Sequence, residues 1–394
     1  MSLIKNIFLV IIVSIATLKI TDLSFGLLQT DAFLVTSTAQ ATNRSIVLRE
    51  FNPSQSATII PNDEYMSKTD SLEQAPYKVK IDDNGFIDNG NTHEPYPELR
   101  IIFFGGSTTE NLYVQTENRF PSVVERTMRK ELNQKITTHN GGVSGNNTMH
   151  SNLALIAKGI PLKPNFVVLM HNVNDLSLLT KTESYWIAPS TRALVAGNSK
   201  STFTTKVSLK STIFFSLKGL KNIIFPNLYA YLQPRLLPYV VKLRGDEFEG
   251  FRGKLSIDFE EGEKQFRSSL VSFAQVTRAW GIEPILMTQA NRINMNDTAF
   301  KALLETSINL GMNPEQYVAM YKKFNNITRM VAIEQNIPLI DLDALIPGSS
   351  KYLYDGVHFN NEGSKLAGKV ISNHFIDILS SKSLVSIHGL NQGN

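Results

Sequence analysis

The stretch from residue 99 to residue 110 limits the possible folds of this chain more than any other. Five of its first six residues are apolar and they show no alternation, which is typical of a strand buried on both faces of a parallel sheet. The run leads into Gly105, Gly106 and Ser107, with Glu110 three residues further on, a spacing that resembles a capping-box helix start. Such a junction places a hydroxyl at the carboxyl edge of the sheet, beside the N–H groups of a helix. Ser107 is therefore either a helix cap or a candidate nucleophile.

A second block, near the C-terminus, favours the nucleophile. Asp355 and His358 lie three residues apart, within residues 354–363. This spacing allows a carboxylate to hold an imidazole in one tautomer while the imidazole reaches a serine. Two further blocks, rich in asparagine, lie between these two, at residues 140–148 and 171–175.

Taken in order, the four blocks resemble those of the SGNH hydrolases, also called GDSL esterases. The resemblance covers about residues 99–379. It implies a catalytic triad of Ser107, Asp355 and His358, and an oxyanion hole formed by Ser107, Gly145 and Asn174. A triad of this kind requires no metal or other cofactor, and the seven histidines are not spaced as metal ligands.

Two of the blocks depart from the family pattern. The first reads Gly-Gly-Ser where the family often has Gly-Asp-Ser, and the third has His171, Asn172 and Val173 where glycines are usual. The second departure leaves the ring of His171 without an assigned role and leaves the substrate class open.

The resemblance implies a serine esterase or acylhydrolase that acts on an O-acyl ester, with an acetylated carbohydrate among the candidate substrates. Two alternatives remain open. The same acyl-enzyme intermediate can pass its acyl group to a sugar hydroxyl, which would make the protein an O-acyltransferase that modifies a cell-envelope or secreted polysaccharide. The chain can also be a binding protein that keeps the fold without catalysis, although an intact triad argues against this.

The N-terminus contains an apolar run at residues 7–18, after Lys5. We interpret residues 1–28 as a hydrophobic helix that serves as a membrane anchor or a signal sequence, with a buried soluble helix as the alternative. Either of the first two interpretations exports the catalytic domain. We therefore expect it to be extracytoplasmic, anchored to a bacterial inner membrane and facing the periplasm, or secreted.

The remainder of the chain divides into a lead-in and a catalytic domain. Residues 29–98 are predicted to form a stem with a small hairpin at residues 77–87. In residues 99–385, strands alternate with helices, which predicts a three-layer α/β/α sandwich with a mostly parallel, flavodoxin-like sheet. An insertion at residues 176–262 interrupts this pattern and is a lid, a membrane-facing surface or an additional packing layer.

Four residues are candidates for the substrate pocket. Tyr185 and Trp186 follow the third block closely enough to reach the pocket mouth, where aromatic rings suit a sugar or an acyl chain. Gln289 and Arg292 come just after a predicted strand at residues 284–287. For each pair the alternative is structural: the rings are core residues, and polar side chains are common in strand-end loops.

Composition excludes other classes of function. The formal net charge is only +4 over 394 residues and the basic residues are scattered, so no nucleic-acid partner is expected. The chain has no cysteine, which excludes disulfides and thiolate chemistry. The expected partners are an acyl ester of a small molecule or glycan and, through the N-terminal helix, a membrane. The oligomeric state is left open.

Overall fold

The computed structural model describes residues 16–17, 19–20, 44–46, 48–91, 94–186, 194–197, 259–294, 296–297 and 314–390. The chain forms two units, and residues 46–196 and 244–394 make up the one that contains the central sheet. Most of the predicted N-terminal helix, and most of the insertion at residues 176–262, lie outside the described residues. Within the described residues, we find no helix of the length and apolar character that a membrane span requires.

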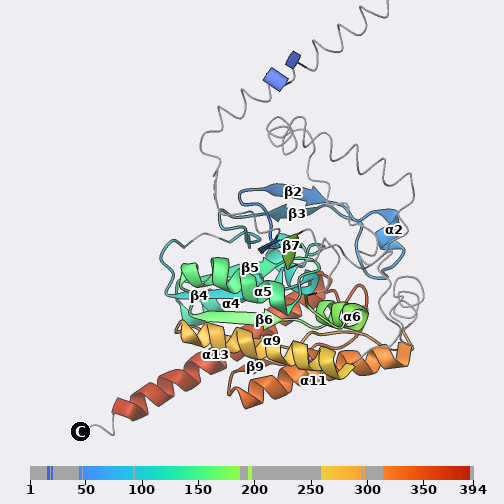
Figure 1. The fold of residues 1–394 in the computed structure, drawn as a ribbon. Helices are drawn as coiled ribbons and strands as arrows, with labels where there is room; N and C mark the ends of the chain where they lie inside the picture. The colour runs from blue at the N-terminus through green and yellow to red at the C-terminus, as the bar shows by residue number, and fades with distance from the viewer. Residues whose placement is uncertain are drawn as a thin grey trace, which may run out of the picture. The chain divides into compact units, whose positions relative to one another are not determined.

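The central sheet has five parallel strands in the order β5-β4-β6-β8-β9, as Figure 1 shows in part. The strands are β4 (Leu99–Gly105), β5 (Ile136–Gly142), β6 (Phe166–Met170), β8 (Glu283–Met287) and β9 (Leu339–Ile340). The predicted parallel sheet is confirmed. Because β4 lies between the strands that follow it in sequence, the strand order reverses at β4, and crevices for ligands form at such a point in α/β sheets.

Helices cover both faces of the sheet, which confirms the three-layer prediction. One face of the sheet packs against α4 (Phe120–Leu132) and α13 (Asn361–Leu390), and Ile101 and Phe103 belong to this core. Ile102 and Phe104 belong to the opposite core, with α9 (Phe259–Ala279) and α11 (Pro314–Glu334). These two helices run side by side in Figure 1. Successive residues of β4 thus point to opposite cores, so the strand needs apolar residues at its odd-numbered and its even-numbered positions.

Two shorter helices complete the layer with α9. Helix α5 (Thr148–Ala154) packs against α9, and α6 (Val173–Thr182) packs against both α9 and α11. The two helices follow β5 and β6, respectively, and both begin at the carboxyl edge of the sheet. They therefore position the second and third sequence blocks next to the end of β4.

The predicted hairpin at residues 77–87 is confirmed in part, since the backbone N–H groups of Asp82 and Asp88 donate to the carbonyls of Phe86 and Lys80, both at 2.8 Å. Strand β3 (Tyr77–Lys80) pairs antiparallel with β2 (Ser56–Ile59), which lies in the segment interpreted as a stem. Residues Ile81 and Ile87 form a single bridge, and Ile87 also bridges Asn140 on the edge strand β5. The short polar sequence of β2 gives no clear alternation, so the pattern did not identify it as a partner of β3. Elsewhere, β1 (Arg44–Ile46) pairs with β7 (Val195–Gly197).

Candidate active site

Ser107, His358 and Asp355 form a hydrogen-bonded row at the carboxyl edge of the sheet. His358 Nε2 lies 2.8 Å from Ser107 Oγ, and His358 Nδ1 lies 2.7 Å from Asp355 Oδ2. The other carboxylate oxygen of Asp355 accepts hydrogen bonds from the backbone N–H groups of Val357, at 2.9 Å, and His358, at 2.8 Å. The structure thus brings together the three residues that the sequence predicted as a triad, with the carboxylate fixed by its own loop.

The electrostatics of the pair suit a histidine that accepts a proton. Burial lowers the pKa of His358, but the charge of Asp355 and its hydrogen bond outweigh this, and the pKa lies above the ordinary value. The pKa of Asp355 is below its usual range, because the imidazole and two backbone N–H groups more than offset burial. The ring of Tyr354 stacks on the imidazole, with centroids 5.5 Å apart and planes 8° apart. The site therefore favours the imidazolium–carboxylate pair that forms when the serine loses its proton.

The capping-box interpretation of Ser107 and Glu110 is wrong. Helix α3 (Ser107–Glu110) begins at Ser107, with Gly106 as its cap residue and no side-chain cap hydrogen bond. The hydroxyl of Ser107 is bonded to His358 instead, and the Glu110 carboxylate accepts from the hydroxyl of Ser144. A cap would place the serine hydroxyl against its own helix, where it could not attack a substrate.

The Asn174 amide and the Asn146 carbonyl, which follows Gly145, lie close to Gly106, the residue before Ser107. Gly145 adopts a φ of +78°, which favours glycine. One N–H of the Asn174 side-chain amide donates a hydrogen bond of 2.8 Å to the Asn146 carbonyl. The amide has a second N–H, which this bond does not use. A Cβ atom at Gly106 would overlap this amide nitrogen. The glycine at position 106, where the family often has aspartate, therefore allows Asn174 to lie against the nucleophile's loop.

Glu110 is a site residue that the sequence did not identify beyond its capping pattern. It is 2% exposed, and its carboxylate accepts hydrogen bonds from the hydroxyl and the backbone N–H of Ser144. Burial raises its pKa to about 7, against the opposing effect of these hydrogen bonds. Because Ser144 immediately precedes Gly145, Glu110 holds the turn that carries this predicted oxyanion donor.

A buried polar cluster connects the segments that carry the second and third sequence blocks. Asp175 Oδ1 accepts from the backbone N–H of Thr148 at 2.9 Å and from the hydroxyl of Tyr185 at 2.5 Å. His171 Nε2 lies 2.8 Å from the hydroxyl of Ser151. This cluster joins the start of α5 to α6, which bears Asn174, and it gives His171 the structural role that the sequence left unassigned.

The four predicted pocket residues are not brought together. Tyr185 is 3% exposed and belongs to the core, whereas Trp186 is 69% exposed. Gln289 is buried and accepts a hydrogen bond from the backbone N–H of Val173 at 3.0 Å. Gln289 therefore supports the start of α6, and the structural alternative applies to Tyr185.

Arg292 also has a structural role. It forms two hydrogen bonds with the carboxylate of Asp70, at 3.0 and 2.5 Å, and donates to the Leu353 carbonyl at 3.2 Å. The guanidinium is buried, so it needs such partners. The prediction that Arg292 lines the pocket is therefore replaced by an ion pair that fixes the loop before the triad aspartate.

The lead-in segment also packs on this loop. Helix α2 (Asp63–Met66) carries Tyr65, whose hydroxyl lies 3.1 Å from that of Tyr354. The backbone N–H of Asp70 donates to the Tyr354 carbonyl at 3.1 Å. The described part of the predicted stem is thus part of the catalytic unit, and it braces the aromatic ring that stacks on His358. Within the described ranges, no group of three or more histidine or acidic side chains is placed to hold a metal ion.

Comparisons with known proteins give matches only among solved structures. No protein-family model and no curated protein matches the chain. An α/β-hydrolase from the metagenome of Lake Arreo is 13% identical, with 71% of this chain and 94% of that chain covered and a TM-score of 0.38. An acetylxylan esterase from Geobacillus stearothermophilus is 14% identical, with 70% and 94% covered and a TM-score of 0.38.

A third match is a lipase/acylhydrolase from Enterococcus faecalis, which is 16% identical, with 70% and 94% covered and a TM-score of 0.39. A lipolytic protein of the G-D-S-L family from Desulfitobacterium hafniense is 13% identical, with 70% and 99% covered and a TM-score of 0.37.

Proposed function

We propose that this protein is a serine esterase or acylhydrolase of the SGNH type, which cleaves an O-acyl ester through an acyl-enzyme intermediate. The observation that carries the proposal is the row from Ser107 through His358 to Asp355, with bonds of 2.8 and 2.7 Å. A serine hydroxyl is a weak nucleophile until a neighbouring base takes its proton, and this row supplies the base and the group that orients it.

In the acylation step, Ser107 Oγ attacks the ester carbonyl carbon while His358 Nε2 takes the hydroxyl proton. Asp355 stabilises the imidazolium that forms and holds the ring so that Nε2 faces the serine. The imidazolium then protonates the leaving alcohol, and the acyl group stays on Ser107. The raised pKa of His358 supports this exchange, because it favours the protonated ring at the stage where the proton must be held.

The negative charge on the carbonyl oxygen needs donors near Ser107. The backbone N–H groups of Ser107 and Gly145 and the second N–H of Asn174 are the candidates. The turn that carries Gly145 is held by Glu110 through Ser144, and Asn174 is anchored on the Asn146 carbonyl. Donors fixed before the reaction stabilise the transition state without a reorganisation cost.

Hydrolysis ends when water attacks the acyl-enzyme with His358 as the base. A sugar hydroxyl at the same position would instead give acyl transfer. Hydrolysis and acyl transfer share the acylation step and differ only in the molecule that accepts the acyl group. An experiment that offers water and an acceptor sugar together therefore distinguishes them.

The proposal is tested with the purified full chain and p-nitrophenyl esters of increasing acyl length. We expect a burst of about one p-nitrophenol per protein molecule when deacylation is slow, followed by steady turnover. Adding an unacylated oligosaccharide then partitions the acyl group. Free acid as the main product supports the hydrolase, and acylated oligosaccharide as the main product assigns acyl transfer. No turnover of any ester, and no acyl-enzyme by mass spectrometry, would favour the non-catalytic alternative.

We also propose that the protein acts outside the cytoplasm, on the basis of the apolar run at residues 7–18. Fractionation of cells that express the full chain tests this. Retention in the membrane fraction after a carbonate wash, with the catalytic domain open to an externally added protease, supports an anchored extracytoplasmic protein. A cytosolic full-length chain would contradict the proposal.

A further inference from the structure

The loop that carries the triad acid and base is a short hairpin whose two sides are bonded to each other. Leu353 and Phe359 form an antiparallel bridge, and the backbone N–H of Tyr354 donates to the His358 carbonyl at 2.9 Å. Tyr354 and His358 therefore lie opposite each other, and their rings stack with centroids 5.5 Å apart and planes 8° apart. Tyr354 is 4% exposed, so the position of its ring depends on its buried neighbours.

The stacked ring restricts a motion of the imidazole that its hydrogen bonds allow. His358 Nδ1 lies 2.7 Å from Asp355 Oδ2, and Nε2 lies 2.8 Å from Ser107 Oγ. Both nitrogens lie in the ring plane, so the ring can tilt about the line that joins them without breaking either bond. A ring packed flat on the imidazole opposes this tilt. An aromatic face also attracts a cation within about 6 Å, so the stack favours the imidazolium that forms during acylation.

The lead-in segment holds Tyr354 at both ends. At the backbone, the N–H of Asp70 donates to the Tyr354 carbonyl at 3.1 Å. At the far end of the ring, the Tyr354 hydroxyl lies 3.1 Å from the hydroxyl of Tyr65. The rings of Tyr65 and Tyr113 also pack edge-on against Tyr354, with centroids 6.3 and 6.4 Å away and planes at 67° and 71°. The hydroxyl of Tyr65 thus fixes the end of the ring that no backbone bond restrains.

Tyr65 is itself held in place near the start of α2. Its backbone N–H donates to the side chain of Asn62, which caps the helix, at 2.8 Å, and its ring packs on Tyr113 with centroids 5.0 Å apart. Burial and the charge of Asp355 raise the pKa of Tyr65 well above its ordinary value. The hydroxyl therefore stays neutral at ordinary pH, and it acts on the site by holding a ring rather than by carrying a charge.

We propose that Tyr65 is a positioning residue for catalysis. Its hydroxyl fixes the ring of Tyr354, and this ring keeps the His358 imidazole directed at the nucleophile. The inference rests on the proposed esterase function, because it assigns Tyr65 a role in that reaction. It also makes the lead-in, which precedes the four sequence blocks, a part of the active site.

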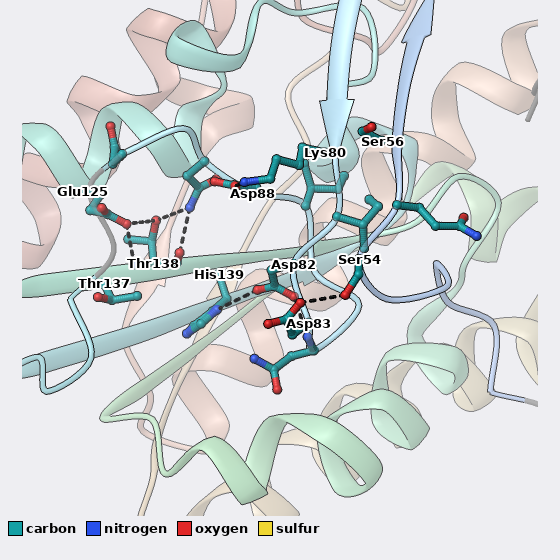
Figure 2. A pocket seen from close by; sticks show the side chains of 16 residues that line it. Ser54, Ser56, Lys80, Asp82, Asp83, Asp88, Glu125, Thr137, Thr138 and His139 are labelled. Atoms are coloured by element: carbon teal, nitrogen blue, oxygen red, sulfur yellow. Dashed lines mark hydrogen bonds and ion pairs between the residues drawn. The ribbon is translucent and has the colours of Figure 1, made fainter. Parts of the chain in front are cut away.

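The lead-in meets the sheet at a second place, which offers a control. Figure 2 shows this pocket, whose lining residues come from the lead-in, α4 and β5 and include none from the triad loop. There the hydroxyl of Ser54 donates to Asp83 at 2.6 Å, and Asp82 lies beside His139. Removing a lead-in hydrogen bond here weakens the segment without changing the support of Tyr354.

Tyr65→Phe in the full chain tests the proposal, because it removes the hydroxyl and keeps the ring. We expect kcat for p-nitrophenyl acetate to fall about tenfold with KM changed by less than about twofold, since the base loses its alignment while the ester site is unaltered. Tyr354→Phe breaks the same bond and should lower kcat to a similar extent. The double variant should lose no more activity than the weaker single variant, because the two hydroxyls act as one unit.

A second measurement follows the imidazole without catalysis. The titration of His358 is recorded by NMR on protein labelled at histidine, and its signal is assigned by its absence in His358→Gln. Asp355 and Glu110 are the charged groups that act on this imidazole, and Tyr65→Phe alters neither. The pKa of His358 should be lower in Tyr65→Phe than in wild type, because a loosened stack favours the imidazolium less.

Two variants control for the loss of a hydroxyl bond outside the triad loop. Tyr77→Phe loses the buried bond to the Glu73 carbonyl at 2.9 Å, and Ser54→Ala loses the bond to Asp83. Both should keep wild-type kcat and the wild-type titration of His358, even where the melting temperature falls.

Three results would overturn the proposal while the esterase proposal stands. The first is wild-type kcat and an unchanged His358 titration in Tyr65→Phe. The second is a loss of kcat that Tyr77→Phe reproduces, since the hydroxyl of Tyr65 then only stabilises the fold. The third is a double variant whose losses multiply, because Tyr65 then does not act through Tyr354. Absence of any ester turnover and of an acyl-enzyme in the wild type rejects the esterase proposal itself, and the catalytic role of Tyr65 with it.

Discussion

Among the residues that the structure describes, two groups place a serine, a histidine and an aspartate in a row, and the geometry of only one of them suits catalysis. In the first, His358 Nε2 lies 2.8 Å from Ser107 Oγ, and in the second, His171 Nε2 lies the same 2.8 Å from Ser151 Oγ. The serine–histidine distance therefore does not distinguish the two groups.

The aspartates do distinguish them. Asp355 lies 2.7 Å from its histidine, whereas the nearest oxygen of Asp175 lies 3.5 Å from His171. Asp175 instead accepts from Thr148 and Tyr185 through its other oxygen. Burial lowers the pKa of His171 to about 3 and raises the pKa of Asp175 to about 6, while the pKa of His358 is raised.

The comparison shows that composition and spacing do not make a triad by themselves. A catalytic histidine must gain a proton during the reaction, and the environment of His171 opposes its charged form. Ser151 is 1% exposed, so a substrate has no access to its hydroxyl. Ser107 directly follows the loop at the carboxyl end of β4 and is only partly buried, so it is more accessible than Ser151.

The largest expected effect tests this comparison directly. Ser107→Ala should lower kcat for ester hydrolysis by about 10⁴-fold or more, because the nucleophile is lost. Ser151→Ala should change kcat by less than about tenfold, since it removes only a buried hydrogen bond. A fluorophosphonate probe should label wild type and Ser151→Ala, but not Ser107→Ala. Labelling of Ser107→Ala would show that another serine is the nucleophile.

The next effect concerns the donors that only the first group has. Asn174→Ala should lower kcat by about 10²–10³-fold with a much smaller change in KM, because the amide meets a full charge only in the transition state. Steady-state kinetics on a small acetyl ester measures this. Asn152→Ala removes a buried amide outside the site and serves as the control. An equal loss in kcat and in binding would indicate that Asn174 is structural.

Glu110 provides a test based on pH. Its folded-state pKa of about 7 exceeds the reference value of 4.5, so the folded protein binds the proton more tightly and loses stability as pH rises from about 4.5 to 7. Glu110→Gln removes this titration while its amide oxygen still accepts from Ser144. Relative to wild type, the variant should become more stable by about 3 kcal/mol between pH 4.5 and pH 8.

Urea unfolding at several pH values measures that difference. A difference that does not change with pH would show that the Glu110 carboxyl titrates normally. Glu110→Leu removes the acceptor as well, so it should lower kcat while Glu110→Gln preserves it. Equal activity of the two variants would contradict the role of Glu110 in holding the turn that carries Gly145.

The smallest expected effect compares two adjacent aromatic residues near the second group. Tyr185→Phe removes the hydrogen bond to Asp175 and should destabilise the fold by about 1–2 kcal/mol, with kcat little changed. Trp186→Phe, at an exposed position, should change stability by less than about 0.5 kcal/mol. Thermal unfolding of both variants provides the measurement. A large loss of kcat in Tyr185→Phe without a loss of stability would indicate that this residue lines the substrate pocket.

The sequence by itself determined the elements whose signals are local. Residues 99–104 are apolar at every position except Arg100, so they identify a strand buried on both faces. The spacing of Asp355 and His358 lies within one loop, and the structure brings both to Ser107 as predicted. Gly145 needs its positive φ at its own position, so its residue type already indicates the turn.

Only the tertiary structure decided the contacts between distant segments. The sequence does not indicate that β2 pairs with β3, that Arg292 binds Asp70, or that the Glu110 carboxylate turns to Ser144 rather than to its own helix. The sequence was compatible with Tyr185 at the pocket mouth or in the core, and in the structure its hydroxyl binds Asp175 in the core. In each case a polar or aromatic side chain suits several local settings. Which partner such a side chain binds depends on the polar group that is buried next to it in the folded chain and that also requires a hydrogen bond.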